Sequence, residues 1–276
     1  MVRHSFVLLS CALGLSTALS ACSPSYREDQ LISGIERICT TEYHYQVSVR
    51  KIGQTIAVHL HHPGILQQEQ RQIGLSPSAN EILGNILEAI HRVTLSSDAP
   101  INFYLLLVSD PAVPGAYLTI VRYVDDVKRA HANVIPPTEL FSRTILDLKY
   151  AGMPSIALDQ IILNDIRLEQ FLSWQLSKRI QTKLSETLQQ RGMPVAEVGP
   201  CAGEFRNGEF VFTLNVTPRG VPFKDEQVQQ LFQDATGVIA QVLSGYRFND
   251  FTTVRLIHPP TGRNLLLPKI RLELFR

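Results

Sequence analysis

The same order of predicted elements occurs twice in this chain, once in each half. In the first half, residues 43–50 and 56–60 alternate between apolar and polar side chains, which predicts two strands joined by a short glycine turn. An apolar stripe with helical spacing follows at residues 82–93, and further strands are predicted at 101–108 and 116–123. The predicted order is therefore strand, strand, helix, strand, strand.

The second half repeats this order with clearer signals. Asn207-Gly208 predicts a two-residue hairpin turn, because both central positions of such a turn need positive φ. Residues 210–216 alternate as a strand, and the most regular helical stripe of the chain comes next. A strand at 251–258 and a turn with prolines and glycine follow, and alternation over residues 270–274 predicts a last strand.

This repetition predicts an α+β protein of two similar β-β-α-β-β units, each an antiparallel sheet with one helix on a face. The alternative is that the two orders match by chance, as α+β domains often do. A mainly helical connector is expected between the units, because residues 165–191 carry a helical apolar pattern. The predicted divisions are a signal peptide at 1–21, a lipidated tether and short helix at 22–41, an α+β unit at 42–123, the connector at 124–194 and a second α+β unit at 195–276.

The first residues have a different character from the rest of the chain. Arg3 and His4 form a basic head, and residues 6–19 form an apolar run, which is the layout of a secretory signal peptide. The run has about 14 residues, whereas a membrane-spanning helix needs roughly 20. No later apolar run is long enough to span a membrane, so no second span is expected.

The run ends in Leu19-Ser20-Ala21-Cys22, which resembles the bacterial lipobox. The resemblance covers this segment alone, and no domain family is recognised in the rest of the chain. It implies that Cys22 becomes the first residue of the mature protein and carries acyl chains that anchor it to a membrane. Ser23 follows the cysteine, which in a Gram-negative cell favours the outer membrane, facing the periplasm. An ordinary cleaved signal with a chance cysteine is the alternative.

The charges argue against a nucleic-acid partner. The chain has 26 Lys and Arg against 25 Asp and Glu, and removing Arg3 with the signal leaves the two balanced. A balanced chain has no strong global field that would steer it to an anionic polymer. An apolar content of 45% is enough for a real core.

Two cysteines remain in the folded part if Cys22 takes the lipid. Cys39 and Cys201 each precede the first hairpin of their repeat, and an exported protein meets an oxidising environment. A Cys39–Cys201 disulfide is therefore predicted, and it would contribute roughly 4–5 kcal/mol at most through the long loop that it closes. Two separate buried thiols are the alternative.

A histidine cluster is the strongest candidate for a metal-binding site in the sequence. On a strand, His59 and His61 point to the same face, about 6.5–7 Å apart. Two such imidazoles can share a Zn²⁺ ion if a third ligand, His91 or His44, joins them. The alternative is a polar strand face without a ligand.

Other motifs are weak, and no cofactor is expected. The chain lacks a Gly-x-Ser-x-Gly elbow, a His-Glu-x-x-His helix, a Walker loop and a dinucleotide fingerprint. Asp125-Asp126 is a paired carboxylate that is expected to be a solvated helix start.

Two loops are candidate contact surfaces, because proline-containing loops are ordered before binding. They fall at equivalent ends of the two predicted units, and the alternative is that they are only turns. Their residues are Pro111, Pro114 and Gly115 in the first repeat, and Pro259, Pro260 and Gly262 in the second.

These features together predict a lipid-anchored protein of the cell envelope without catalytic activity. It would act through protein–protein contact as an accessory or assembly component, with an envelope protein as its partner. One alternative is a periplasm-facing module that binds a small ligand or metal in a cleft between the units or at the histidines. A hydrolase of unrecognised type is the second alternative.

Overall fold

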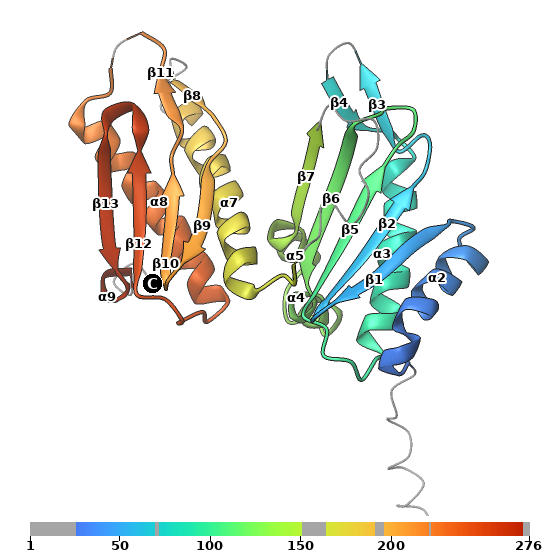
Figure 1. The fold of residues 1–276 in the computed structure, drawn as a ribbon. Coiled ribbons are helices and arrows are strands. Elements are labelled where there is room, and N and C mark those ends of the chain that lie inside the picture. Colours follow the sequence, from blue (N-terminus) through green and yellow to red (C-terminus); the bar gives the residue numbers. More distant parts are fainter. Residues whose placement is uncertain (1–25, 70–71, 151–163, 191–195, 221, 273–276) are drawn as a thin grey trace, which may run out of the picture. The chain divides into compact units, whose positions relative to one another are not determined.

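The computed structural model describes residues 26–69, 72–150, 164–190, 196–220 and 222–272. Within these ranges the protein has an α+β fold, as predicted, and it divides into two compact units between Asp165 and Ile166 (Figure 1). Unit 1 precedes this division and unit 2 follows it. The predicted signal peptide and the lipidation site Cys22 lie outside the described residues, so both remain predictions.

Unit 1 is built on a five-stranded sheet with helices α2 (Leu31–Thr41) and α3 (Ala79–Leu95) along one face (Figure 1). Strands β2 and β5 are parallel, and the other neighbours are antiparallel. In sheet order the strands are β1 (Val47–Ile52), β2 (Thr55–His61), β5 (Phe103–Ser109), β6 (Ala116–Tyr123) and β7 (Ile145–Tyr150). A separate hairpin consists of β3 (Leu66–Glu69) and β4 (Gln72–Leu75).

The core of unit 1 lies between this sheet and its two helices. Every second residue of a strand points to the same face, so Val58 and Leu60 of β2 enter the core while His59 and His61 point away from it. The main buried residues from the helices are Leu31, Ile35, Ile38, Ile82, Ile86 and Ile90, and the sheet adds Leu106, Val108, Leu118 and Ile120.

Unit 2 has a four-stranded sheet and a core against helices α7 (Leu168–Gln190) and α8 (Asp225–Gly245) (Figure 1). In sheet order the strands are β13 (Arg263–Pro268), β12 (Thr253–His258), β10 (Glu209–Thr213) and β9 (Ala202–Arg206). Short strands β8 (Ala196–Val198) and β11 (Val216–Pro218) form a second, antiparallel pair. The 3-10 turns η1 (Glu28–Gln30) and η2 (Pro259–Thr261) and the short helix α9 (Lys269–Leu272) complete the two units.

The two units share one order of elements: a helix, a hairpin, a crossover helix and a second hairpin. The predicted β-β-α-β-β order is thus confirmed, but each sheet is mixed rather than purely antiparallel. The strands joined by the crossover helix, β2 with β5 and β10 with β12, are parallel. A helix that crosses one face returns the chain in the same direction, which produces a parallel pair. Two helices pack on one face of each sheet, whereas a single helix per sheet was expected.

The segment expected to be a connector contributes to both units. Helices α4 (Val124–His131) and α5 (Pro137–Arg143) and strand β7 belong to unit 1, whereas α7 belongs to unit 2. The last predicted strand, over residues 270–274, is wrong where the structure describes it, because Lys269–Leu272 form the short helix α9. Among the described residues, none of the helices has the length and hydropathy that crossing a membrane requires.

Candidate functional site

The two predicted contact loops, here called the proline loops, join equivalent strands. The first spans residues 110–115 between β5 and β6, and the second spans residues 258–262 between β12 and β13. All four prolines, Pro111, Pro114, Pro259 and Pro260, are exposed. Gly115 (φ 81°) and Gly262 (φ 67°) end the loops in the left-handed region, which explains why glycine stands at both positions.

Asp110 holds the first proline loop from inside unit 1. Its side chain is 2% exposed, and its Oδ2 accepts hydrogen bonds from the backbone N–H groups of Ile65 (2.8 Å) and Leu66 (2.9 Å). Its Oδ1 accepts the N–H of Ala112 (2.8 Å) within the loop. Val113 is buried as well, so the loop is fixed at two points. Three backbone donors compensate for burying the carboxylate, which would otherwise be costly.

His258 holds the second proline loop in the same way. It has no exposed surface, and its Nε2 lies 2.9 Å from the carbonyl oxygen of Val216, while its Nδ1 lies 2.8 Å from the hydroxyl of Thr261. A carbonyl can only accept, so Nε2 carries the proton and Nδ1 accepts from Thr261. Burial lowers the pKa of His258, and the bond to Val216 partly opposes this. The ring is therefore neutral near pH 7.

These two anchors were missed by the sequence analysis, although a signal was present. Each is a polar residue that ends a strand directly before a proline, Asp110-Pro111 in one repeat and His258-Pro259 in the other. Each bonds to the chain that follows the first hairpin of its main sheet, beyond β2 for Asp110 and beyond β10 for His258. The proline loops are thus ordered by equivalent contacts and present exposed prolines.

The structure brings His59 and His61 together around a residue that was not predicted, Ser109. His59 Nε2 and His61 Nδ1 lie 2.8 Å and 2.9 Å from the Ser109 hydroxyl, and the two ring centres are 6.2 Å apart. The hydroxyl has one proton, so it donates to one imidazole and accepts from the other. Burial, with a smaller contribution from His61, lowers the pKa of His59.

His91, the expected third ligand, lies elsewhere. It projects from α3 into the core face of the sheet, where its Nε2 is 2.6 Å from the hydroxyl of Tyr104. Its pKa is lowered to about 3, mainly by burial and to a smaller extent by the charges of Arg122 and His131. His59 and His61 point to the opposite face, so the three histidines do not form one site. Within the described ranges, no group of three His, Cys, Asp or Glu residues is placed to hold a metal ion.

The two cysteines are free thiols in the structure. Cys39 has no exposed surface and belongs to the core of unit 1, whereas Cys201 is half-buried in unit 2. Burial raises the pKa of Cys39 to about 11 and that of Cys201 to about 12. The disulfide therefore stays a prediction, and the alternative of two buried thiols agrees with this geometry.

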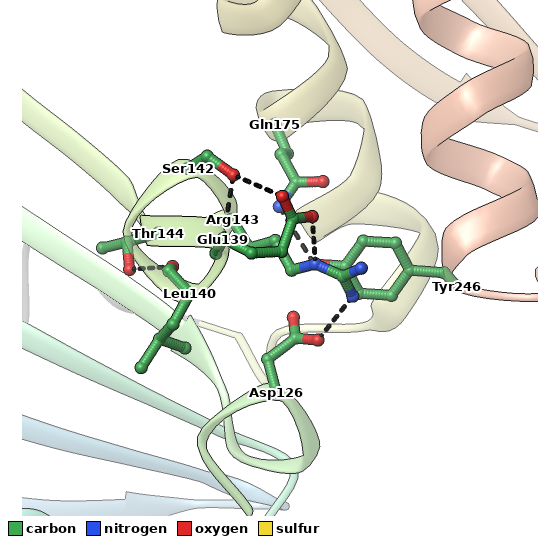
Figure 2. A network of polar contacts seen from close by, with 8 residues as sticks. All are labelled: Asp126, Glu139, Leu140, Ser142, Arg143, Thr144, Gln175 and Tyr246. Carbon is green, nitrogen blue, oxygen red and sulfur yellow. Dashed lines mark hydrogen bonds and ion pairs between the residues drawn. The ribbon is translucent and has the colours of Figure 1, made fainter. Parts of the chain in front are cut away.

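A buried ion pair replaces the solvated helix start that was expected at Asp125-Asp126. Asp126 is 1% exposed, and its Oδ1 accepts from Arg143 Nη1 at 2.8 Å (Figure 2). Arg143 Nε donates to Glu139 one turn earlier on α5, also at 2.8 Å. The pair joins α4 to α5, so its role is structural. Figure 2 also draws a bond internal to unit 2, in which Gln175 Nε2 donates to the Tyr246 hydroxyl at 3.0 Å.

Comparison with known proteins adds no further assignment. No family model matches this chain, and neither does a curated protein or a solved structure.

Proposed function

We propose that this chain is a lipid-anchored protein of the cell envelope that acts through protein–protein contact, as an accessory or assembly component without catalytic activity. The lipobox-like segment ending at Cys22 supports the anchor and, through Ser23, the periplasmic face of an outer membrane. The balanced charge supports a protein rather than a nucleic acid as the partner.

One observation carries the contact half of the proposal: the two proline loops are equivalent, exposed and fixed from inside. Buried Asp110 and His258 hold the loops by hydrogen bonds to backbone. A loop that is already ordered loses less conformational entropy when it binds, so more of the contact energy becomes affinity.

Site-specific photo-cross-linking in the envelope tests this proposal. A photoreactive residue at Ala112 or Pro260, both exposed on the proline loops, should cross-link to one defined envelope protein. Glu88 on α3 and Gln233 on α8 are exposed control positions and should give no such product. Asp110→Asn, which loosens the first loop, should lower the yield at Ala112. Equal products from the loop and control positions would contradict the proposal.

A ligand-binding module is the alternative that His59 and His61 favour. Two imidazoles with 6.2 Å between their ring centres can serve as two of the ligands of Zn²⁺. Titration of the untagged protein with Zn²⁺ tests it. Binding that disappears in His59→Gln and persists in His91→Gln would support this alternative.

The hydrolase alternative rests on Ser109, because a hydroxyl beside an imidazole is the pairing that a serine nucleophile needs. In the described part of the chain, no Asp or Glu hydrogen-bonds to His59 or His61 to orient the ring as a triad requires. A fluorophosphonate probe should therefore leave the protein unlabelled. Labelling of the wild type that Ser109→Ala abolishes would overturn the non-enzymatic proposal.

A further inference from the structure

A pocket of about 230 Å³ lies at the start of the folded chain. It is the strongest candidate for a binding site outside the surfaces above. Its lining residues are Tyr26, Gln30, Ser33, Gly34 and Arg37. The last four occupy positions i, i+3, i+4 and i+7, so they share one face of the chain where it enters α2.

Tyr26 forms the wall opposite the helix and is held there by its backbone. Its N–H donates to the carbonyl oxygen of Ser96 (3.2 Å), and it forms a bridge with Ser97 just after α3. Its ring lies against Gly34, where an added Cβ would come within 3.1 Å of two ring carbons. The glycine at position 34 therefore lets the ring of Tyr26 pack closely against α2, so this wall of the pocket is held in place by the fold.

The lining offers donors and one positive charge, and it contains no carboxylate. Gln30 uses its Oε1 to accept the N–H of Arg27 (3.2 Å), which leaves its amide NH₂ as a donor. Arg37 is exposed, and in the described part of the chain no carboxylate lies within ion-pair distance of it. The carboxylate of Glu42 accepts two hydrogen bonds from Arg92, which are the main cause of its lowered pKa, and the charge of Arg37 makes only a smaller contribution. A donor-lined cationic pocket is suited to an anion.

The position of the pocket indicates which anion it meets. Tyr26 follows Cys22 by four residues, and four residues span at most about 14 Å even when fully extended. If Cys22 is acylated, as the proposed function holds, the pocket stays within reach of the lipid headgroups. Arginine binds phosphate through its planar fork of N–H donors, and basic residues near an anionic leaflet gain favourable energy from it.

We propose that this pocket binds the phosphate of an anionic phospholipid headgroup, with Arg37 as the charged ligand and Gln30 and Tyr26 as additional donors. The inference rests on the proposed lipid anchor. It adds a second, headgroup-specific contact to the acyl chains and would fix the orientation of unit 1 at the membrane.

Native mass spectrometry of the full mature protein in detergent micelles tests the proposal. Micelles doped with phosphatidylglycerol should give lipid adducts, and micelles doped with phosphatidylcholine should give fewer. Arg37→Gln should reduce the phosphatidylglycerol adducts about fivefold, the factor that corresponds to about 1 kcal/mol for one basic residue at an anionic surface. Gln30→Glu, which places a carboxylate in the pocket, should reduce them as well. Arg271→Gln, at an exposed position on α9, is the matched control and should not.

The outcomes test the pocket independently of the lipid anchor, and they distinguish a lipid headgroup from free phosphate as the ligand. Adducts that are equal in Arg37→Gln and wild type would overturn the pocket, whatever the state of Cys22. Inorganic phosphate that displaces the lipid at millimolar concentration would overturn a lipid headgroup as the ligand. The same spectra show whether the intact protein carries the mass of the acyl chains, so a missing acyl group would contradict the anchor independently of the adducts.

Discussion

Asp110 and His258 occupy the same place in the two units, although one is an acid and the other a base. Each is buried, each stands directly before the first proline of its loop, and each hydrogen-bonds the backbone that follows the first hairpin of its main sheet. The acid meets N–H groups at Ile65 and Leu66, and the neutral imidazole meets a carbonyl at Val216. The two proline loops are thus held in the same way with opposite hydrogen-bond roles, since Asp110 accepts from backbone and His258 donates to it. This similarity supports a duplication that has since diverged.

Replacing Asp110 should destabilise unit 1. In Asp110→Asn one oxygen becomes an NH₂ group that faces a backbone N–H, and the buried donor left without an acceptor costs about 2 kcal/mol. Asp98→Asn changes an exposed carboxylate and should stay within about 0.5 kcal/mol of the wild type. Urea unfolding followed by circular dichroism measures both. An Asp110→Asn protein as stable as the wild type would show that the loop does not depend on this carboxylate.

Local features of the fold were predictable from the sequence, and long-range ones were not. The Asn207-Gly208 turn was found because positive φ at both residues is a property of those residues alone, and the structure has φ of 50° and 78° there. The role of Asp110 depends on Ile65, which is 45 positions away, and the pairing of β2 with β5 brings the two segments together. No periodicity within either segment contains that information.

The expectation that His91 would join His59 and His61 was wrong for a related reason. Alternation along β2 correctly placed His59 and His61 on one face, because a strand has a period of two. The position of His91 depends on which face of the sheet α3 covers, and a helical stripe does not specify that. Ser109 was missed because a single serine at a strand end carries no signal until its neighbouring strand is known.

The stability of unit 1 should fall with acidity because of His91. Its pKa is about 6.5 in the unfolded chain and about 3 in the folded one, so the unfolded state binds the proton first as the pH decreases. The contribution is fully present above pH 6.5 and is lost toward pH 3, with a slope of up to about 1.4 kcal/mol per pH unit. His91→Gln should remove this part of the slope in unfolding experiments between pH 7 and pH 4.

Tyr104→Phe is the control for this experiment. It removes the hydroxyl that bonds His91 Nε2 but leaves the imidazole buried, and burial is the main cause of the lowered pKa. The slope should therefore persist in Tyr104→Phe even if the absolute stability decreases. A slope that is unchanged in His91→Gln would assign the acid sensitivity to other groups.

The buried ion pair should be more sensitive than its exposed neighbour. Asp126→Asn removes the buried carboxylate from Arg143 but leaves the contact of Arg143 with Glu139, so the cost should lie toward the lower end of the about 3–5 kcal/mol that breaking a buried pair costs. Asp125→Asn, one residue earlier and exposed, should cost less than about 0.5 kcal/mol. Thermal unfolding of the two variants compares them directly, and equal losses would mean that Asp126 is solvated after all.

The cysteines should behave as two protected thiols. A thiol reacts as its thiolate, and burial raises the pKa of Cys39 to about 11, so alkylation at pH 8 should be slow until the protein unfolds. Peptide mapping after alkylation, with and without urea and with no reductant, distinguishes the two possibilities. A peptide in which Cys39 is linked to Cys201 would confirm the predicted disulfide and contradict two free thiols.

Acylation of Cys22 is the prediction on which the membrane location depends. Cells fed a radiolabelled fatty acid should label the wild-type protein, and Cys22→Ser should carry no label, because the serine hydroxyl cannot replace the thiol in lipobox processing. The variant should also leave the membrane fraction, since several acyl chains provide stable anchoring that one pocket contact cannot replace. Cys11→Ser, within the apolar run, is the matched control and should be labelled normally. A Cys22→Ser protein that remains labelled and membrane-bound would mean that another residue holds the lipid.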